Sequence, residues 1–323
     1  MISFIAQRIA KAIVVLFALV VLNFFLIRMA PGDPALVMAG EAGAGDQVFL
    51  AQLREKFGLD QPLPVQLFLY VKGILSLDLG FSFRQQMPVA TLILQRLPAT
   101  LLLTGTAFAI SLAFGILFGA LAARFAGTWA DTTITVAALI FYATPLFWVA
   151  LMAILLFSVT LDWLPSFGYE TVGANYTGLA HVLDVAAHLI LPATTIGLFF
   201  MATYARMTRA SMLEVVRLDF VKTARAKGLS DTVIQRRHVL RNALLPVVTL
   251  AGLQAGTLVG GAVLTETVFA WPGIGRLMYE ALLQRDYNLL LGVFVVCSAM
   301  VLAFNLITDL VYRSVDPRIE FAS

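Results

Sequence analysis

Charged residues are scarce in this chain. Asp, Glu, Lys and Arg make up 13% of its 323 residues, whereas 60% are hydrophobic. A soluble domain typically has about 25% charged and 45–50% apolar residues. One soluble core cannot bury so large an apolar excess. The composition therefore indicates a second apolar medium, the lipid bilayer.

Cysteine and histidine are nearly absent as well. The single cysteine, Cys297, lies in an apolar run, which excludes an intramolecular disulfide and a cysteine-based metal cluster. The three histidines form no HExxH motif, and neither a Gly-x-Ser-x-Gly element nor a clustered acid pair points to an intramembrane enzyme. No Gly-x-x-x-x-Gly-Lys-Ser/Thr loop is present to cradle ATP phosphates. We expect a non-catalytic chain that holds no metal and no cofactor.

Six segments are long and apolar enough to cross a hydrocarbon core, which takes roughly 20 helical residues. Helices are required, because lipid cannot satisfy a bare backbone. The expected spans are 9–30, 98–123, 132–160, 187–205, 243–267 and 288–312. The apolar run of the first span is longer than the about 7–15 residues of a signal peptide, so we expect it to be retained.

These spans predict an all-α polytopic membrane protein. Its expected parts are an N-terminus with the first span at 1–30, an outer loop or cap at 31–97, a transmembrane core at 98–313 and a tail at 314–323. The interiors of the second to fifth spans hold no Asp, Glu, Lys or Arg. Ion-coupled transporters usually carry ionisable residues at membrane depth, so that class is disfavoured.

Lysine and arginine are distributed unevenly between the loops. The loop 206–242 contains nine of them, whereas the loop 161–186 contains none. Short basic loops stay in the cytoplasm. The sequence therefore predicts that both termini and the loop 206–242 are cytoplasmic and that the loop 161–186 lies outside.

The outer segment 31–97 is too long for a plain linker. Two stretches within it have a helical pattern, at 47–57 and 64–76. We interpret it as a small folded cap outside the membrane. Two roles stay open at this point: contact with a soluble partner, or packing on the membrane helices alone.

The loop 206–242 has the most specific pattern in the chain. No proline or glycine interrupts Met212 to Lys227, and Gly228 supplies a helix stop. Ser230 is a suitable N-cap for a second helix that runs towards Asn242.

Such a pair of helices would form a compact knuckle. We expect it to expose Phe220 and the small residues Ala224 and Ala226, which could enter a groove on another protein. The alternative is a basic amphipathic loop that orients the chain and touches anionic lipid.

The same loop resembles a known family. Asp219-Phe-Val-Lys-Thr-Ala-Arg-Ala-Lys-Gly-Leu229, followed by Arg237-His-Val-Leu-Arg-Asn-Ala-Leu-Leu-Pro246, is similar to the "EAA" loop of ABC-importer permeases, in the form of the dipeptide/oligopeptide/nickel permease family. Gly228 matches the glycine of that loop, which puts Lys222-Thr223-Ala224 at its Glu-Ala-Ala positions. Other family-like stretches along the chain are Pro31-Gly-Asp-Pro34, Asp78-Leu-Gly80, Arg206-Met-Thr-Arg209, Leu264-Thr-Glu-Thr-Val-Phe269, Trp271-Pro-Gly-Ile-Gly275 and Asp316-Pro-Arg318.

The resemblance implies a permease of six helices in the bacterial inner membrane. Its implied partners are a second, homologous permease, two ATP-binding subunits that bind ATP and Mg, an extracytoplasmic solute-binding protein and membrane lipid, with no nucleic acid. The implied solute is a dipeptide, an oligopeptide or a related compound such as glutathione or a nickel chelate. The implied contact with the ATPase comprises Asp219, Phe220, Lys222, Thr223, Ala224, Arg225, Ala226, Lys227 and Gly228.

Two further patterns belong to the fifth span. A glycine every fourth residue lets another helix approach closely, either within this chain or from a partner permease beside the pathway. The residues of this stripe and its neighbours are Gly252, Gln254, Gly256, Thr257 and Gly260. At the outer end, Glu266 and the turn Trp271-Pro272-Gly273 could form an outer gate, a contact for the solute-binding protein or a rigid structural turn.

Overall fold

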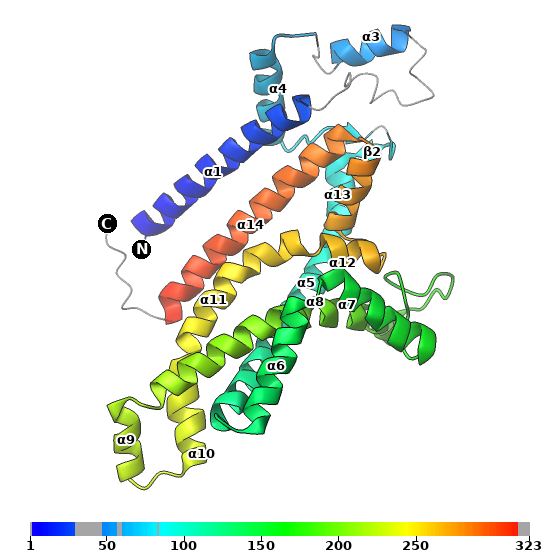
Figure 1. Ribbon diagram of the computed structural model, residues 1–323. Helices are drawn as coiled ribbons and strands as arrows, with labels where there is room; N and C mark the ends of the chain where they lie inside the picture. Colours follow the sequence, from blue (N-terminus) through cyan, green and yellow to red (C-terminus); the bar gives the residue numbers. More distant parts are fainter. Residues whose placement is uncertain (1, 30–46, 57–59, 83, 316–323) are drawn as a thin grey trace. The chain divides into compact units, whose positions relative to one another are not determined.

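The computed structural model describes residues 2–29, 47–56, 60–82 and 84–315, without the side-chain surroundings of residues 2–6, 27–28, 53, 56, 256–261 and 309–315. Most of the described chain is helical (Figure 1). The helices are α1 (Ile2–Arg28), α3 (Gln47–Lys56), α4 (Leu63–Leu75), α5 (Val89–Arg124), α6 (Trp129–Ala143), α7 (Leu146–Ala153), the π-helix η1 (Ile154–Thr160), α8 (Gly178–Val215), α9 (Asp219–Ala226), α10 (Asp231–Val233), the π-helix η2 (Ile234–Val239), α11 (Leu240–Gly261), α12 (Val263–Val268), α13 (Ile274–Leu283) and α14 (Tyr287–Val315).

The chain forms two compact units. Unit 1 comprises residues 1–100 and 272–303, and unit 2 comprises residues 101–271 and 304–323. Helices α5 and α14 run from one unit into the other.

Unit 1 contains the two helices expected in the outer segment, α3 and α4, which confirms that prediction. It also has a short antiparallel pair, β1 (Phe81–Ser82) and β2 (Met87–Pro88), in a segment without a strand pattern. The helix that contains the second expected span is longer than the span, because α5 begins at Val89. Residues 89–97 are apolar enough to join the unit's core. That core comprises Val89, Leu92, Ile93, Ile274, Leu277, Ala281, Leu289, Leu290 and Val293.

Unit 2 is built on a close approach of α5 and α8. A Cβ added to Gly115 would lie 2.5 Å from Cβ of Tyr204, and one added to Gly119 would lie 2.5 Å from the carbonyl oxygen of Ala205. On α8, a Cβ at Gly197 would lie 2.6 Å from Cγ2 of Ile110. The sequence Gly115-x-x-x-Gly119 is therefore a small-residue contact that lets two helix backbones meet. We call these three positions the glycine seam.

Four helices of the described residues are long and apolar enough to cross a membrane, and a bent pair makes a fifth candidate. They lie at 7–26, 89–124, 178–215 and 287–308, with the bent pair at 129–160. Each covers most or all of an expected span. The remaining expected span, the fifth at 243–267, corresponds to α11 and α12, which are separated by Ala262.

The third expected span is not one straight helix. Helices α6 and α7 meet at an angle of 103°. Thr144, between them, has φ −82° and ψ 135°, and Pro145 follows it. A residue before proline is pushed out of the helical region by the proline ring, so the chain turns there.

Candidate functional site

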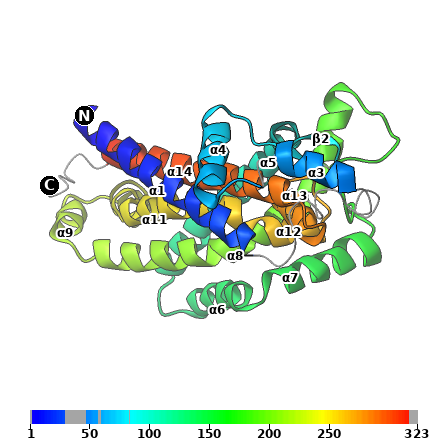
Figure 2. The same cartoon turned by 90° about the horizontal axis from the view of Figure 1, so that it is seen from above.

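The strongest candidate site is the α9 hairpin, which we define as residues 216–239. Figures 1 and 2 both place α9 at the end of unit 2 opposite the loop 161–177. The expected unbroken helix from Met212 to Lys227 is wrong. Helix α8 ends at Val215, Leu218 is extended at φ −72° and ψ 151°, and α9 begins at Asp219.

An apolar core explains the break. Residues from the end of α8, from α9 and from the η2–α11 arm pack together, and Ala120 and Ala123 of α5 complete the cluster. Its buried members are Met212, Val221, Ala224, Ile234, Val239 and Ala243. Burial of an amphipathic face stabilises a short helix more than intrinsic propensity does. The chain therefore turns where the turn brings α9 back onto this core.

Packing of this core differs from the exposure predicted at the tip of the hairpin. Ala224 is 6% exposed, so the expectation that it faces outward is wrong. Phe220 is 40% exposed, as expected, and Ala226 is also exposed. The outward face of α9 consists of Phe220 with polar and charged residues. A partner would contact that face and not Ala224.

Gly228 ends α9, as predicted. Its φ is +78°, a left-handed conformation that glycine adopts without strain. The Gly228 N–H donates to the Arg225 carbonyl at 2.9 Å, and the Leu229 N–H donates to the Ala224 carbonyl at 3.3 Å. This pair of hydrogen bonds is a Schellman motif. Ser230 is the N-cap residue of the next helix, as predicted, although its side chain makes no capping hydrogen bond.

Two of the six basic side chains of the hairpin form ion pairs with its two acidic residues. Lys222 Nζ donates to Asp219 Oδ1 at 2.8 Å, and Arg225 Nε lies 3.6 Å from Asp231 Oδ1. All four side chains are exposed, so these pairs contribute little to stability. The other four basic side chains have no acidic counterpart within the hairpin sequence, so Phe220 lies on a hairpin with a net positive charge.

Within the glycine stripe of α11, the structure describes the surroundings of Gly252. A Cβ on Gly252 would lie 2.1 Å from Cγ2 of Thr308 on α14, and the Thr308 hydroxyl donates to the Gly252 carbonyl at 2.9 Å. The alternative of packing within the chain is therefore confirmed at Gly252. The surroundings of Gly256, Thr257 and Gly260 lie outside the described residues.

We expect Gly252→Ala to destabilise the protein by about 1–3 kcal/mol, because a tightly packed contact cannot take another methyl group. Thr308→Ser removes the clashing Cγ2 and keeps the hydroxyl. The double variant Gly252→Ala with Thr308→Ser should recover most of the loss. Thermal unfolding of the purified protein measures this, and an equal loss with and without Thr308→Ser contradicts the assignment.

The turn after α12 is buried in this conformation. Trp271 is 0% exposed and packs against Tyr169 in a tilted arrangement with ring centroids 4.9 Å apart, and Glu266 is equally buried. The Trp271 N–H donates to the Glu266 carbonyl at 2.8 Å, and the Gly168 N–H donates to the Phe269 carbonyl at 2.9 Å. The structure therefore favours the rigid turn that the sequence left open. A direct contact of Glu266 or Trp271 with a binding protein does not fit this burial.

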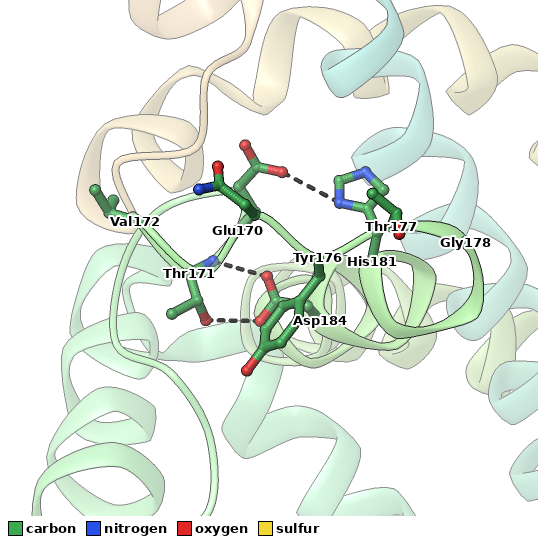
Figure 3. A pocket seen from close by; sticks show the side chains of 10 residues that line it. Glu170, Thr171, Val172, Tyr176, Thr177, Gly178, His181 and Asp184 are labelled. Atoms are coloured by element: carbon green, nitrogen blue, oxygen red, sulfur yellow. Dashed lines mark hydrogen bonds and ion pairs between the residues drawn. The ribbon is translucent and has the colours of Figure 1, made fainter.

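A polar cavity in the loop before α8 escaped the sequence analysis. It has a volume of about 640 Å³ and is lined by Glu170, Tyr176, His181 and Asp184, among others (Figure 3). His181 Nδ1 lies 3.2 Å from Glu170 Oε2, and Asp184 accepts two hydrogen bonds of 2.7 Å from Thr171. These contacts fasten the acidic loop to the first turns of α8.

Two protein-family models together match nearly the whole chain. Residues 115–321 match the "binding-protein-dependent transport system inner membrane component" family, and residues 1–104 match the N-terminal family of such membrane components. Among curated relatives, a putative peptide transport system permease of Brucella abortus (strain 2308) is 40% identical, over 99% of this chain and 100% of its own. The dipeptide transport system permease DppB of Escherichia coli (strain K12) is also 40% identical, over 99% of each chain.

Solved structures of ABC transporters are similar to this chain in fold. An inward-facing MetNI methionine ABC transporter chain matches with a TM-score of 0.56 at 21% identity, over 70% of this chain and 96% of its own. An amino acid ABC transporter crystallised with histidines matches with a TM-score of 0.52 at 17% identity, over 69% and 94%. The chain thus belongs to the inner-membrane components of binding-protein-dependent transport systems, and within them to the peptide-type permease subunits of ABC importers.

Proposed function

We propose that this permease subunit forms one half of the membrane pathway through which an ABC importer takes up peptides. The Brucella abortus and Escherichia coli relatives are named for peptide and dipeptide transport, and they align over nearly their full length. Dipeptides or oligopeptides are therefore the proposed solutes, with glutathione and nickel chelates as related alternatives.

The proposed assembly comprises a second, homologous permease, two ATP-binding subunits and an extracytoplasmic solute-binding protein. ATP and Mg bind to the ATP-binding subunits, and this chain takes no chemical part in hydrolysis. The family to which the chain belongs supports this division of roles. The lack of a phosphate-binding loop in the sequence supports it as well.

The proposed topology has six spans, with both termini and the α9 hairpin in the cytoplasm. The cap after α1 and the loop 161–177 then lie outside. The concentration of Lys and Arg in residues 206–242 supports this orientation. The opposite placement of the hairpin and the loop 161–177 within unit 2 supports it too (Figures 1 and 2).

One observation supports a role for the α9 hairpin in coupling to the ATP-binding subunits. The α9 hairpin has its own apolar core and presents Phe220 outward at its end of unit 2. A preformed, aromatic-tipped knuckle suits insertion into a pocket of an ATP-binding subunit, because buried aromatic anchors dominate protein interfaces. A loop that only orients the chain needs neither the core nor the ring.

A cysteine reporter tests both orientation and docking. In a Cys297→Ser background, we expect Phe220→Cys to crosslink to an ATP-binding subunit in the assembled complex. A membrane-impermeant thiol reagent should label it in inverted vesicles that lack the ATP-binding subunits, and not in intact cells. The matched control is Val221→Cys, whose side chain faces the hairpin core and should neither crosslink nor react.

The outer reporter is Val172→Cys, at a side chain that is 98% exposed in the loop 161–177. It should react in intact cells. Labelling of Phe220→Cys from outside would refute the orientation. Equal reactivity of Phe220→Cys with and without the ATP-binding subunits would refute the docking.

A further inference from the structure

A partly buried ion pair, with a buried carboxylate and a guanidinium that is one-third exposed, joins α6 to α8 in unit 2. Arg209 donates from Nε to Asp131 Oδ1 at 2.6 Å and from a terminal guanidinium nitrogen to Oδ2 at 2.7 Å. The Gly127 N–H donates to Asp131 Oδ2 at 3.0 Å, and Asp131 is 5% exposed. The two-pronged geometry fixes both the distance and the orientation of the two helices.

Stability alone does not account for this pair. Burial of the Asp131 carboxylate costs free energy that its attraction to the partly exposed Arg209 offsets, so the pair is weak evidence for a stabilising role. A bidentate Arg–carboxylate contact is better suited to fixing one arrangement among several, because its geometry is specific.

Arg209 lies three residues before Met212, and Met212 belongs to the core of the α9 hairpin. The last two turns of α8 thus contact both the hairpin, through Met212, and the start of α6, through Arg209. Ala120 and Ala123 at the end of α5 pack on the same hairpin core. The loop that joins α5 to α6 is pinned between these contacts through Gly127.

The other end of α6 is tied to α8 as well. The Tyr142 ring stacks on Phe199 with centroids 5.6 Å apart, and the Arg206 guanidinium lies 5.0 Å from the centre of the Tyr142 ring. The chain then bends after Ala143. Beyond the bend, α7 and η1 pack with Leu191 and Phe269 in a separate cluster.

We propose that the Asp131–Arg209 pair is a clamp that makes α6 move together with the α9 hairpin, so that Asp131 and Arg209 are positioning residues for coupled transport. This inference rests on the proposed docking of the hairpin on an ATP-binding subunit. When the hairpin moves, the clamp carries α6 as far as the bend at Thr144 and Pro145. Without it, the hairpin can move while α6 stays behind, and ATP is then hydrolysed without transport.

Three variants test the clamp in the assembled importer. Asp131→Asn keeps the shape and loses the charge, Arg209→Lys keeps the charge and loses the two-pronged contact, and Asp131→Arg with Arg209→Asp exchanges the partners. We expect the first two to assemble with the ATP-binding subunits and to transport at least fivefold less solute per ATP hydrolysed. The exchanged pair should recover part of that ratio.

The control is Glu280→Gln, which breaks the Arg276–Glu280 pair of 2.8 Å in unit 1. It makes the same carboxylate-to-amide change, and the transport per ATP should stay normal. An unchanged ratio in both Asp131→Asn and Arg209→Lys overturns the proposal. Failure of all three variants to insert would make the pair a folding element and would overturn it as well.

A distance measurement separates the clamp from the docking hypothesis. Spin labels at Thr133→Cys on α6 and Lys227→Cys on the hairpin, in a Cys297→Ser background, should give one narrow distance in nucleotide-free and ATP-bound complexes. Asp131→Asn should broaden that distribution, and an unchanged width refutes the clamp. If the ATP-binding subunits do not bind the hairpin at all, docking fails, while the width in the permease alone still reports on the clamp.

Discussion

Replacing Ala224 by aspartate should abolish uptake and release the ATP-binding subunits, with a loss of more than tenfold in each. The new carboxylate would lie in the apolar core with Val221, Ile234 and Met212. Burying an unpaired carboxylate costs several kcal/mol. The hairpin should open rather than keep its shape and lose its partner.

Hydrogen exchange distinguishes these two outcomes. In Ala224→Asp, the amides of residues 219–239 should lose protection even in the isolated permease. The matched control is Ala226→Asp, two residues away on the exposed side, which should leave the protection intact. Full protection together with normal uptake in Ala224→Asp would show that the hairpin core has been misassigned.

The second large effect is expected at the glycine seam. Gly119→Ala places a Cβ 2.5 Å from the Ala205 carbonyl oxygen and 2.6 Å from the Thr208 Cβ. Neither atom is the end of a flexible side chain, so α5 and α8 must separate. We expect a loss of about 1–3 kcal/mol in stability and a severalfold lower yield of inserted protein.

The control for this prediction lies on the same helix. Gly105 of α5 has no atom within 4 Å of an added Cβ, so Gly105→Ala should be neutral or slightly stabilising. Membrane yield and the unfolding temperature of both variants decide the matter. Equal behaviour of Gly119→Ala and Gly105→Ala would mean that α5 and α8 do not approach closely there.

Local signals made much of this molecule predictable. Long apolar runs located the membrane helices, and the helical patterns at 47–57 and 64–76 gave α3 and α4. The stop at Gly228 was also predictable, because glycine is the commonest left-handed residue just after a helix. Each of these features depends on a few neighbouring residues.

Features that depend on distant residues were missed. The burial of Ala224 follows from the turn at 216–218, whose direction is set by Met212, Val239 and Ala120 together. Asp131 borders the expected third span, and its partner Arg209 is 78 residues away, so neither residue reveals the pair. The bend after Ala143 had a visible signal in Pro145, but the angle depends on how α6 and α7 pack on α8.

The length of helix α8 has a further consequence. At 38 residues it measures about 57 Å, nearly twice the roughly 30 Å of a hydrocarbon core. One end is fastened to the acidic loop through Asp184 and Thr171, and the other end carries the hairpin core through Met212. A single rod of this length that tilts about the glycine seam swings its two ends in opposite directions. A small push on the hairpin would then shift the loop 161–177 at the other end of the helix, with Pro192 as the one proline inside it.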